Sequence, residues 1–246
     1  MWGHKRIKEY HWQEIPNWGD KLAPLLLERY AGIKTEWDTV SHARIVSVGS
    51  VLEHIPPLWD GIVLGTGKLY ETSRLHLHTN TATVLGVRGP LTARQCPAGY
   101  EVLGDPGLLA DELVPLPRKQ YDLGLVPHWS DKTNMQNPAY YSSDWSTIVI
   151  DPADDPLVII QNIGSCRKIV TSSLHGMIVA DAFGIPRKFV WSPTMAAEGM
   201  FKFLDYSAAI KLPLKVGEVQ EAYQPFIEDL KYGLYDAYRE LGGLVR

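Results

Sequence analysis

The segment Ser172-Ser173-Leu174-His175-Gly176 combines the residue types best suited to chemistry in this chain of 246 residues. It lies between an apolar run and a helical pattern, and small hydroxyl residues followed by glycine suit a tight strand-to-helix turn. Backbone N–H groups at the start of a helix favour an anion, and a histidine there can act as acid or base near neutral pH. The turn therefore predicts a site for an anionic substrate. On the local pattern alone, a plain helix cap by Ser172 or Ser173 with a packed, neutral His175 remains the alternative.

Two cationic residues follow other apolar runs. Arg88, before Gly89-Pro90, is placed where a bidentate clamp on a carboxylate or phosphate would be useful; an exposed arginine paired with an acid is the alternative. Lys68 ends a glycine-rich segment that looks like part of a phosphate loop but lacks the Walker spacing. His76 and His78 alternate along an extended segment with no third ligand at a useful spacing, so we expect no metal site.

Short apolar runs bounded by turn residues predict the strands that position these groups. The runs are continuous and rich in β-branched residues, as in strands buried on both faces of a parallel sheet. The expected strands are Arg44–Val48, Gly61–Leu64, Ala82–Val87, Tyr121–Val126, Ser146–Ile150, Lys168–Thr171 and Arg187–Trp191. Ligands of such sheets bind beyond the carboxyl ends of the strands, where Arg88, Asp105, His128 and the Ser172 turn are found.

Helical patterns alternate with these strands. The expected helices are Leu22–Tyr30 with Asp20 as N-cap, Leu91–Gln95, Leu157–Cys166, Met177–Phe183 and Val219–Leu241. This alternation predicts βαβ units and an α/β fold with mostly parallel sheets. A stretch with two prolines and no periodicity at 111–120 predicts a linker between two Rossmann-like halves, residues 1–115 and 116–246. We expect a GT-B-like plan with the active site in the cleft between the halves, and a C-terminal helix that packs back on the first half.

The overall composition narrows the class of protein. A formal net charge of −4 argues against a nucleic-acid partner, and the apolar fraction of 45% is ordinary for a globular domain. Two distant cysteines predict free thiols rather than a disulfide framework. No apolar run approaches the length of a membrane span, and the N-terminus lacks the pattern of a secretory signal. We therefore expect a cytoplasmic protein, either free or peripheral at the inner face of the membrane.

Seven segments, taken in order, resemble the polysaccharide pyruvyl transferase family. None of these segments alone is specific for the family, but the occurrence of all seven in this order across residues 17 to 206 is specific for it. They are Asn17-Trp18-Gly19-Asp20, Gly65-Thr66-Gly67, Arg88-Gly89-Pro90-Leu91-Thr92, Leu103-Gly104-Asp105-Pro106, Gly124-Leu125-Val126-Pro127-His128, Ser172-Ser173-Leu174-His175-Gly176 with Ala182-Phe183-Gly184-Ile185-Pro186, and Lys202-Phe203-Leu204-Asp205-Tyr206.

The resemblance implies a transferase that takes phosphoenolpyruvate as donor. The implied acceptor is a sugar of a cell-surface glycan or exopolysaccharide, either free or attached to a lipid. The resemblance implies no further cofactor and no metal. The donor side falls to the C-terminal half and the acceptor side to the N-terminal half. Many members read Ser-Arg-Leu-His-Gly at the turn, whereas this chain has Ser173 in place of the arginine. The turn therefore lacks one positive charge that would face the donor. The sequence does not predict the oligomeric state.

This resemblance assigns roles to the candidate residues. We expect His175 to be the general acid, with His128 or Asp105 taking a proton from the acceptor. The expected donor-binding residues are Arg88, Ser172, Ser173, Gly176 and Lys68, and the expected acceptor-binding residues are Asn17, Trp18, Asp20 and Trp129. Two alternatives stay open: a GT-B glycosyltransferase using a nucleotide sugar, with Glu198 on the ribose, and a catalytically degenerate glycan-binding protein.

Overall fold

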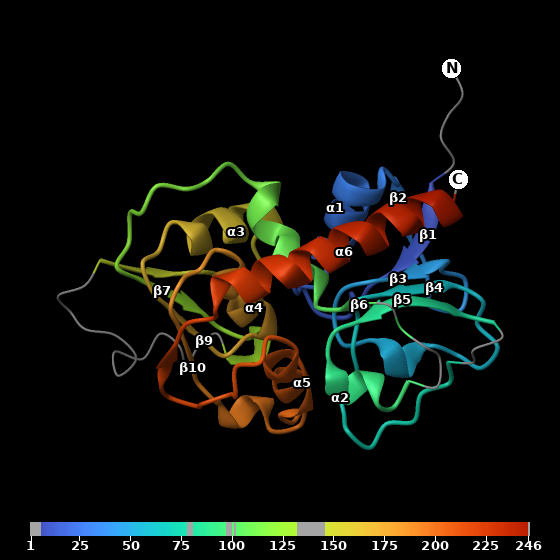
Figure 1. Cartoon of the computed structure of the whole chain (residues 1–246). Coiled ribbons are helices and arrows are strands. Elements are labelled where there is room, and N and C mark those ends of the chain that lie inside the picture. The colour runs from blue at the N-terminus through green and yellow to red at the C-terminus, as the bar shows by residue number, and fades with distance from the viewer. Residues whose placement is uncertain (1–5, 78–80, 97–99, 101, 132–145, 246) are drawn as a thin grey trace.

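Two separate sheets form the framework of the protein, which is described here as a computed structural model covering all residues except 1–5, 78–80, 97–99, 101, 132–145 and 246. The first sheet belongs to the N-terminal part of the chain and the second to the C-terminal part (Figure 1). Ten of the strands are aligned parallel within their sheets and one short edge strand is antiparallel. The prediction of an α/β fold in two mostly parallel halves is confirmed, and the GT-B-like plan stays a prediction.

The first sheet has the strand order β2-β1-β3-β4-β5-β6 and is parallel throughout. Its strands are β1 (Ile7–Tyr10), β2 (Thr35–Trp37), β3 (Ile45–Val46), β4 (Ile62–Leu64), β5 (Thr83–Val87) and β6 (Val102–Leu103). The central strands β3 and β4 are wholly buried. The short helices of this half are α1 (Leu22–Leu26), η1 (Leu27–Ala31), η2 (Leu52–His54) and α2 (Pro90–Ala93).

The second sheet has the order β11-β10-β9-β7-β8, with only β11 antiparallel. Its strands are β7 (Leu123–Val126), β8 (Thr147–Val149), β9 (Ile169–Thr171), β10 (Arg187–Phe189) and β11 (Val219–Gln220). The helices are η4 (Trp129–Asp131), α3 (Pro156–Gly164), α4 (Leu174–Ala182), η7 (Pro193–Met195) and α5 (Phe201–Ala209). Every residue of α4 is buried. The helix η3 (Pro106–Leu113) leads from the first sheet to the second and packs on α4, so the predicted linker begins later than residue 111.

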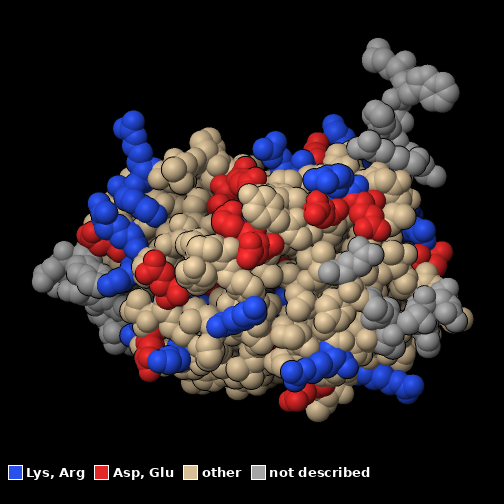
Figure 2. All heavy atoms as spheres, in the orientation of Figure 1, with Lys and Arg blue, Asp and Glu red and all other residues tan. Residues whose placement is uncertain are grey.

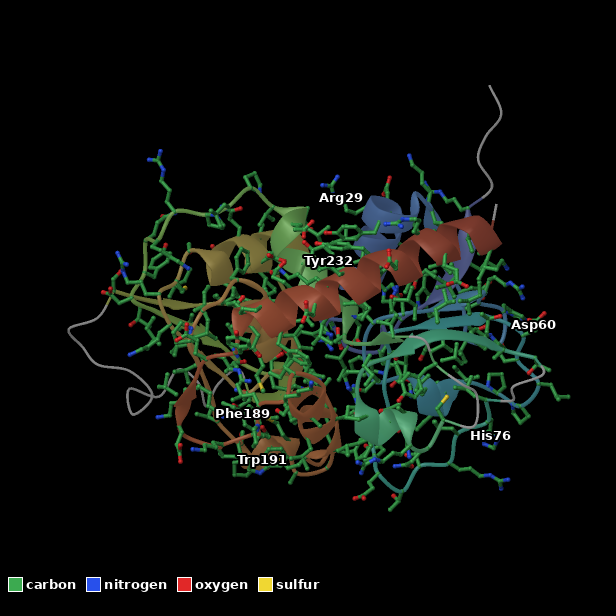
Figure 3. All side chains as sticks on the ribbon, viewed as in Figure 1. Arg29, Asp60, His76, Phe189, Trp191 and Tyr232 are labelled. Carbon is green, nitrogen blue, oxygen red and sulfur yellow. The ribbon has the colours of Figure 1, made fainter. Side chains whose placement is uncertain are left out.

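The last helix, α6 (Gln224–Leu244), crosses from the second half onto the first (Figure 1). It contacts η1, β4, β5 and β6 of the first half as well as α4 of the second. Its buried side includes Leu234, Tyr238 and Leu241, whereas Tyr232 lies 66% exposed on the outer side (Figure 3). On this face of the molecule, acidic and basic side chains are interspersed (Figure 2). In the described part of the chain, no helix has the length and hydropathy needed to cross a bilayer.

Candidate active site

A cavity of about 240 Å³ opens where the carboxyl ends of the two sheets face each other. Both halves line it. The first half contributes Trp12, Asn17, Asp20, Ser50, Val51, His54, Leu69 and Tyr70, and the second contributes His128, Trp129, Ser173, Leu174, His175, Glu198 and Lys202. Six of the residues predicted from the sequence are therefore brought together here, namely Asn17, Asp20, His128, Trp129, Ser173 and His175.

His175 lies in the first turn of α4, two residues after the N-cap Ser173, whose hydroxyl accepts a hydrogen bond from the N–H of Gly176 at 3.4 Å. The imidazole packs against the backbone of the first half, because a Cβ added to Gly19 would lie only 1.9 Å from its Nδ1 atom. Its Nε2 atom is buried without a hydrogen-bond partner. Burial, aided by the positive charges of Lys202 and Arg88, lowers the pKa of His175 to about 3. The ring is therefore neutral in the free protein.

Asp20 is buried at the opposite wall, where its carboxylate accepts a hydrogen bond from the Asn17 side chain at 2.5 Å. The prediction that Asp20 caps the first helix is wrong, because Lys21 is the N-cap and no side chain caps α1. The carboxylate points toward the cavity instead. Burial raises the pKa of Asp20 to about 7, although the charges of His11 and Lys202 oppose the shift. Asp20 can thus hold or release a proton near neutral pH.

Arg88 binds a carboxylate, as predicted for this residue, but the carboxylate is the side chain of Asp205 in the same chain. Its Nε atom donates to the carboxylate of Asp205 at 3.1 Å, and both side chains are fully buried. The two other guanidinium nitrogens donate to the Ser50 hydroxyl and the Lys68 carbonyl, each at 2.5 Å. Asp205 comes from α5, in the other half. With all three nitrogens engaged, Arg88 is not among the cavity-lining residues, and its role toward a donor remains a prediction.

Three further residues predicted to bind the donor also lie outside the lining. Lys68 donates to the side chain of Gln95 and to the carbonyl of Glu71. Ser172 is fully buried, and its hydroxyl donates to Asp131 at 2.8 Å. Gly176 allows close packing, since a Cβ there would lie 2.3 Å from Thr171 Oγ1. These residues support the wall of the cavity.

His128 and Asp105, the two predicted bases, have different positions. His128 lines the cavity after β7, and its Nδ1 pairs with the Ser130 hydroxyl at 2.8 Å. Asp105 lies behind the lining at the N-terminus of η3, where it accepts from Gly107 N–H at 2.9 Å. Its second carboxylate oxygen is buried without a partner. Burial raises the pKa of Asp105 to about 6, against the hydrogen bond from Gly107 and the charge of Arg88. Only His128 can touch a molecule in the cavity directly.

Lys202, in α5, is a cavity residue that the site prediction missed. Its side chain is only 8% exposed, and its ammonium group pairs with Glu198 one helical turn earlier. An isolated Glu–Lys pair at this spacing usually marks an exposed helix face, so local pattern gave it no weight. The one feature of the sequence that could have indicated Lys202 is that it begins the last of the seven segments that resemble the family.

Aromatic rings from both halves meet at the cavity. Trp12, which follows β1, and Trp129, which follows β7, lie with ring centroids 6.2 Å apart. Trp18 is fully buried and meets the His175 ring edge-on, so it packs behind the site rather than facing it. Trp191, two residues after the end of β10, packs edge-on against Phe203. His78, which the sequence places two residues after His76 on an extended segment, lies outside the described residues.

Residues 68–187 match the family model described as polysaccharide pyruvyl transferase. This match spans β5, the strands flanking the linker, and the turn that carries His175. Over these residues the chain is similar to the polysaccharide pyruvyl transferase family. The match confirms the resemblance seen in the sequence, and it supports the expectation of a transferase.

Two relatives extend the similarity beyond the family model. The chain is 29% identical over 216 residues to the succinoglycan biosynthesis protein ExoV of Rhizobium meliloti (strain 1021), a match that covers 83% of this chain and 65% of that protein. It is 28% identical over 216 residues to the uncharacterized protein L143 of Acanthamoeba polyphaga mimivirus, covering 82% of this chain and 74% of the relative. The chain thus spans slightly less than two thirds of the bacterial relative.

Proposed function

We propose that this protein transfers the pyruvyl group of phosphoenolpyruvate to two hydroxyls of one sugar residue in polysaccharide biosynthesis, forming a cyclic ketal. The family match supports the reaction class, and the name of the Rhizobium relative, a succinoglycan biosynthesis protein, supports a role in polysaccharide biosynthesis. The observation that carries the proposal is the cavity between the sheets, where a buried histidine, a lysine and a helix N-terminus face two tryptophans. This set suits an anionic donor on one side and a sugar on the other.

The donor carries a phosphate and a carboxylate, so its binding needs cationic or N–H-rich groups. Lys202 supplies an ammonium group at the cavity wall. The N-terminal turn of α4, which begins beside Ser173 and Leu174, supplies backbone N–H groups and the positive end of a helix dipole. In our proposal Lys202 takes the place of the arginine that many family members have at the position of Ser173.

The proposed reaction balances without an external acid. Protonation of the donor's methylene carbon makes a methyl group and leaves positive character on the adjacent carbon. One sugar hydroxyl attacks that carbon, the carbon–oxygen bond to phosphate breaks, and the second hydroxyl closes the ring. The two hydroxyl protons released equal the two protons consumed, one on the methyl group and one on phosphate. The site therefore has to move protons between fixed positions, which is work for groups such as His175 and Asp20.

His175 remains our proposed acid, and its neutral state in the free protein adds a condition. Its pKa is lowered by burial and by nearby positive charge. A bound anionic donor would reverse the second effect, since an opposite charge favours the imidazolium form. Proton uptake would then accompany donor binding. Asp20, with a pKa of about 7, lies beside Gly19 and can supply that proton near neutral pH.

The acceptor is assigned to the side of the cavity that holds Trp12 and Trp129. Their ring faces are suited to stacking on the apolar face of a sugar, and both line the cavity. His128 lies next to Trp129, with ring centroids 5.1 Å apart, and is the proposed base for the attacking hydroxyl. The family match gives no support to the alternative of a nucleotide-sugar transferase, for which Glu198 is the candidate ribose ligand.

The test is an assay of the purified protein with phosphoenolpyruvate and a panel of oligosaccharide acceptors. We expect phosphate release that depends on the acceptor, and a pyruvyl ketal on the product by mass spectrometry. His175→Ala should lower turnover by about 10²–10⁴-fold with an unchanged circular dichroism spectrum. Transfer from a nucleotide sugar, or near-normal turnover of His175→Ala, would contradict the proposal. Donor binding by thermal shift serves if no acceptor in the panel is used.

A further inference from the structure

Glu198 pairs with both Lys202 and His128 at the wall of the cavity through its carboxylate. One of its oxygens lies 3.3 Å from Nε2 of His128, and the other pairs with the ammonium group of Lys202. All three side chains are largely buried, with 18% exposure for Glu198, 6% for His128 and 8% for Lys202. Glu198 thus joins two residues that come from different elements of the second half.

This ion pair opposes the binding of an anionic donor, which requires a positively charged side chain in the cavity. Lys202 is the one lysine or arginine among the described residues that line the cavity, and Glu198 neutralises it. Although burial opposes ionisation, the hydrogen bond to His128 and the charge of Lys202 lower the pKa of Glu198 to about 2. The carboxylate is therefore charged throughout the physiological pH range. A donor anion cannot pair with the ammonium group of Lys202 while this carboxylate remains in place.

The backbone around Glu198 has room to change. Glu198 lies between η7 and α5, and Gly199 directly after it has a φ of +67°. A Cβ at Gly199 would meet no atom within 4 Å, so this point of the chain is open rather than packed. A turn of the segment about Gly199 would swing the Glu198 side chain without disturbing the core.

We propose that Glu198 is a placeholder for an anionic group of the donor, which takes the place of its carboxylate at Lys202 when it binds and frees Nε2 of His128 to act as the base for the acceptor. This inference rests on the proposed function and adds to it the point where the donor's carboxylate or phosphate is held. It also makes Glu198 a determinant of donor affinity, because every donor molecule must first compete with the internal carboxylate. The placeholder keeps the buried Lys202 paired while the cavity is empty, which avoids the cost of an unpaired buried charge.

The test measures binding to Glu198→Gln, which keeps the side-chain shape and removes its charge. Titration calorimetry with phosphoenolpyruvate should give a Kd about tenfold lower than that of the wild type, as expected when a charge-assisted competitor is removed. Glu218→Gln, an exposed glutamate paired with Lys215, is the matched control and should leave the Kd unchanged. Glu198→Ala should change the Kd in the same direction, and it serves as the second variant if Glu198→Gln does not fold.

Two simpler anions identify the displacing group. Pyruvate carries only the carboxylate and inorganic phosphate only the phosphate, so the one whose affinity rises in Glu198→Gln is the group that competes. If the wild type binds phosphoenolpyruvate and both Glu198 variants bind it equally or more weakly, the placeholder is disproved while the proposed function stands. If neither the wild type nor the variants bind phosphoenolpyruvate, the proposed function and the placeholder both fall.

Discussion

At the scale of single residues, His175 is a proposed catalytic acid whose imidazole is buried and uncharged in the free protein. Its ring is fixed between α4 and Gly19 and has no hydrogen-bond partner for Nε2. An unpartnered buried nitrogen costs stability, and a folded protein retains such an atom where a ligand will use it. The free protein therefore holds a position for a hydrogen bond that only the bound state completes.

The depressed pKa of His175 predicts a specific dependence of stability on pH. The folded pKa is about 3, whereas the ordinary value is 6.5, so the unfolded chain binds a proton below pH 6.5 that the folded protein does not. Stability from this group is therefore lost as pH falls from about 6.5 toward 3, by about 2 kcal/mol at pH 5. His175→Gln should lose less thermal stability than the wild type between pH 7 and pH 5.

Asp20 and Asp105 act in the opposite sense, because their folded pKa values of about 7 and 6 lie above their ordinary values. They bind protons in the folded state first, so acidification through these values stabilises the protein. Both remain in His175→Gln, and the difference between the two melting curves isolates the histidine. Equal changes in Tm for the two proteins would show that His175 titrates normally.

The residues that the sequence predicted best are those whose neighbours in the chain restrict them. Ser173 and His175 follow a buried strand directly, and His128 does too, so the sheet alone brings them to one edge. Lys202 and Asp205 could not be placed in this way. Their partners depend on how α5 packs against the first half, and no local pattern encodes that packing. The same reason hides the internal partner of Arg88.

At the scale of elements, α5 joins the two halves through its contact with α2. Asp205 of α5 accepts hydrogen bonds from the backbone N–H groups of Leu91 and Thr92, each at 2.9 Å, and from the Thr92 hydroxyl at 2.7 Å. It also pairs with Arg88. One carboxylate therefore satisfies the first turn of a helix in the other half, a role usually taken by a residue of the same helix.

This contact predicts that Asp205→Asn is strongly destabilising. The substitution leaves the fully buried Arg88 without its charged partner, which costs about 3–5 kcal/mol, and it weakens the cap of α2. Urea unfolding at constant pH measures the loss. Asp236→Asn is the matched control, because Asp236 pairs with Arg239 at an exposed site. A change below 1 kcal/mol in Asp205→Asn, similar to that of the control, would disprove the role of the contact.

All seven strands predicted from apolar runs are present as β3, β4, β5, β7, β8, β9 and β10. Four of them, β3, β4, β7 and β9, are buried along their whole length, which makes such strands visible in the sequence as continuous apolar runs. The missed strands carry weaker signals. β1 reads Ile7-Lys8-Glu9-Tyr10 at half-buried positions, and β6 and β11 have two residues each. Helix α5 was missed because Lys202 and Asp205 are buried within it, which reverses the expected polar face.

At the scale of the whole molecule, the halves are joined by more than a linker. The Arg88–Asp205 pair, the packing of η3 on α4, and α6 all cross between them. Lys231 of α6 adds a buried ion pair with Asp111 of η3 at 2.8 Å and donates to the carbonyl of Ala182 in α4 at 3.3 Å. A cavity shared by both halves keeps its geometry only if they stay in register.

Such coupling predicts that the two halves unfold together. Differential scanning calorimetry should show one transition, with equal calorimetric and van 't Hoff enthalpies. Lys231→Met tests this coupling, because it removes the ion pair with Asp111 and the hydrogen bond to Ala182. The variant should show a broader or split unfolding transition. Two resolved transitions in the wild type would contradict the prediction, since independent halves would melt separately.

The path of α6 also has a consequence for how the protein is made. Its buried residues complete the core of the first half, and Gly242 packs directly on the carbonyl of Ala31. A ribosome releases the first sheet well before it releases this helix. The first half therefore has to wait, with part of its apolar surface uncovered, until the second half has been synthesised. During that interval the nascent chain is a candidate for chaperone binding, because transiently exposed apolar surface is prone to aggregation.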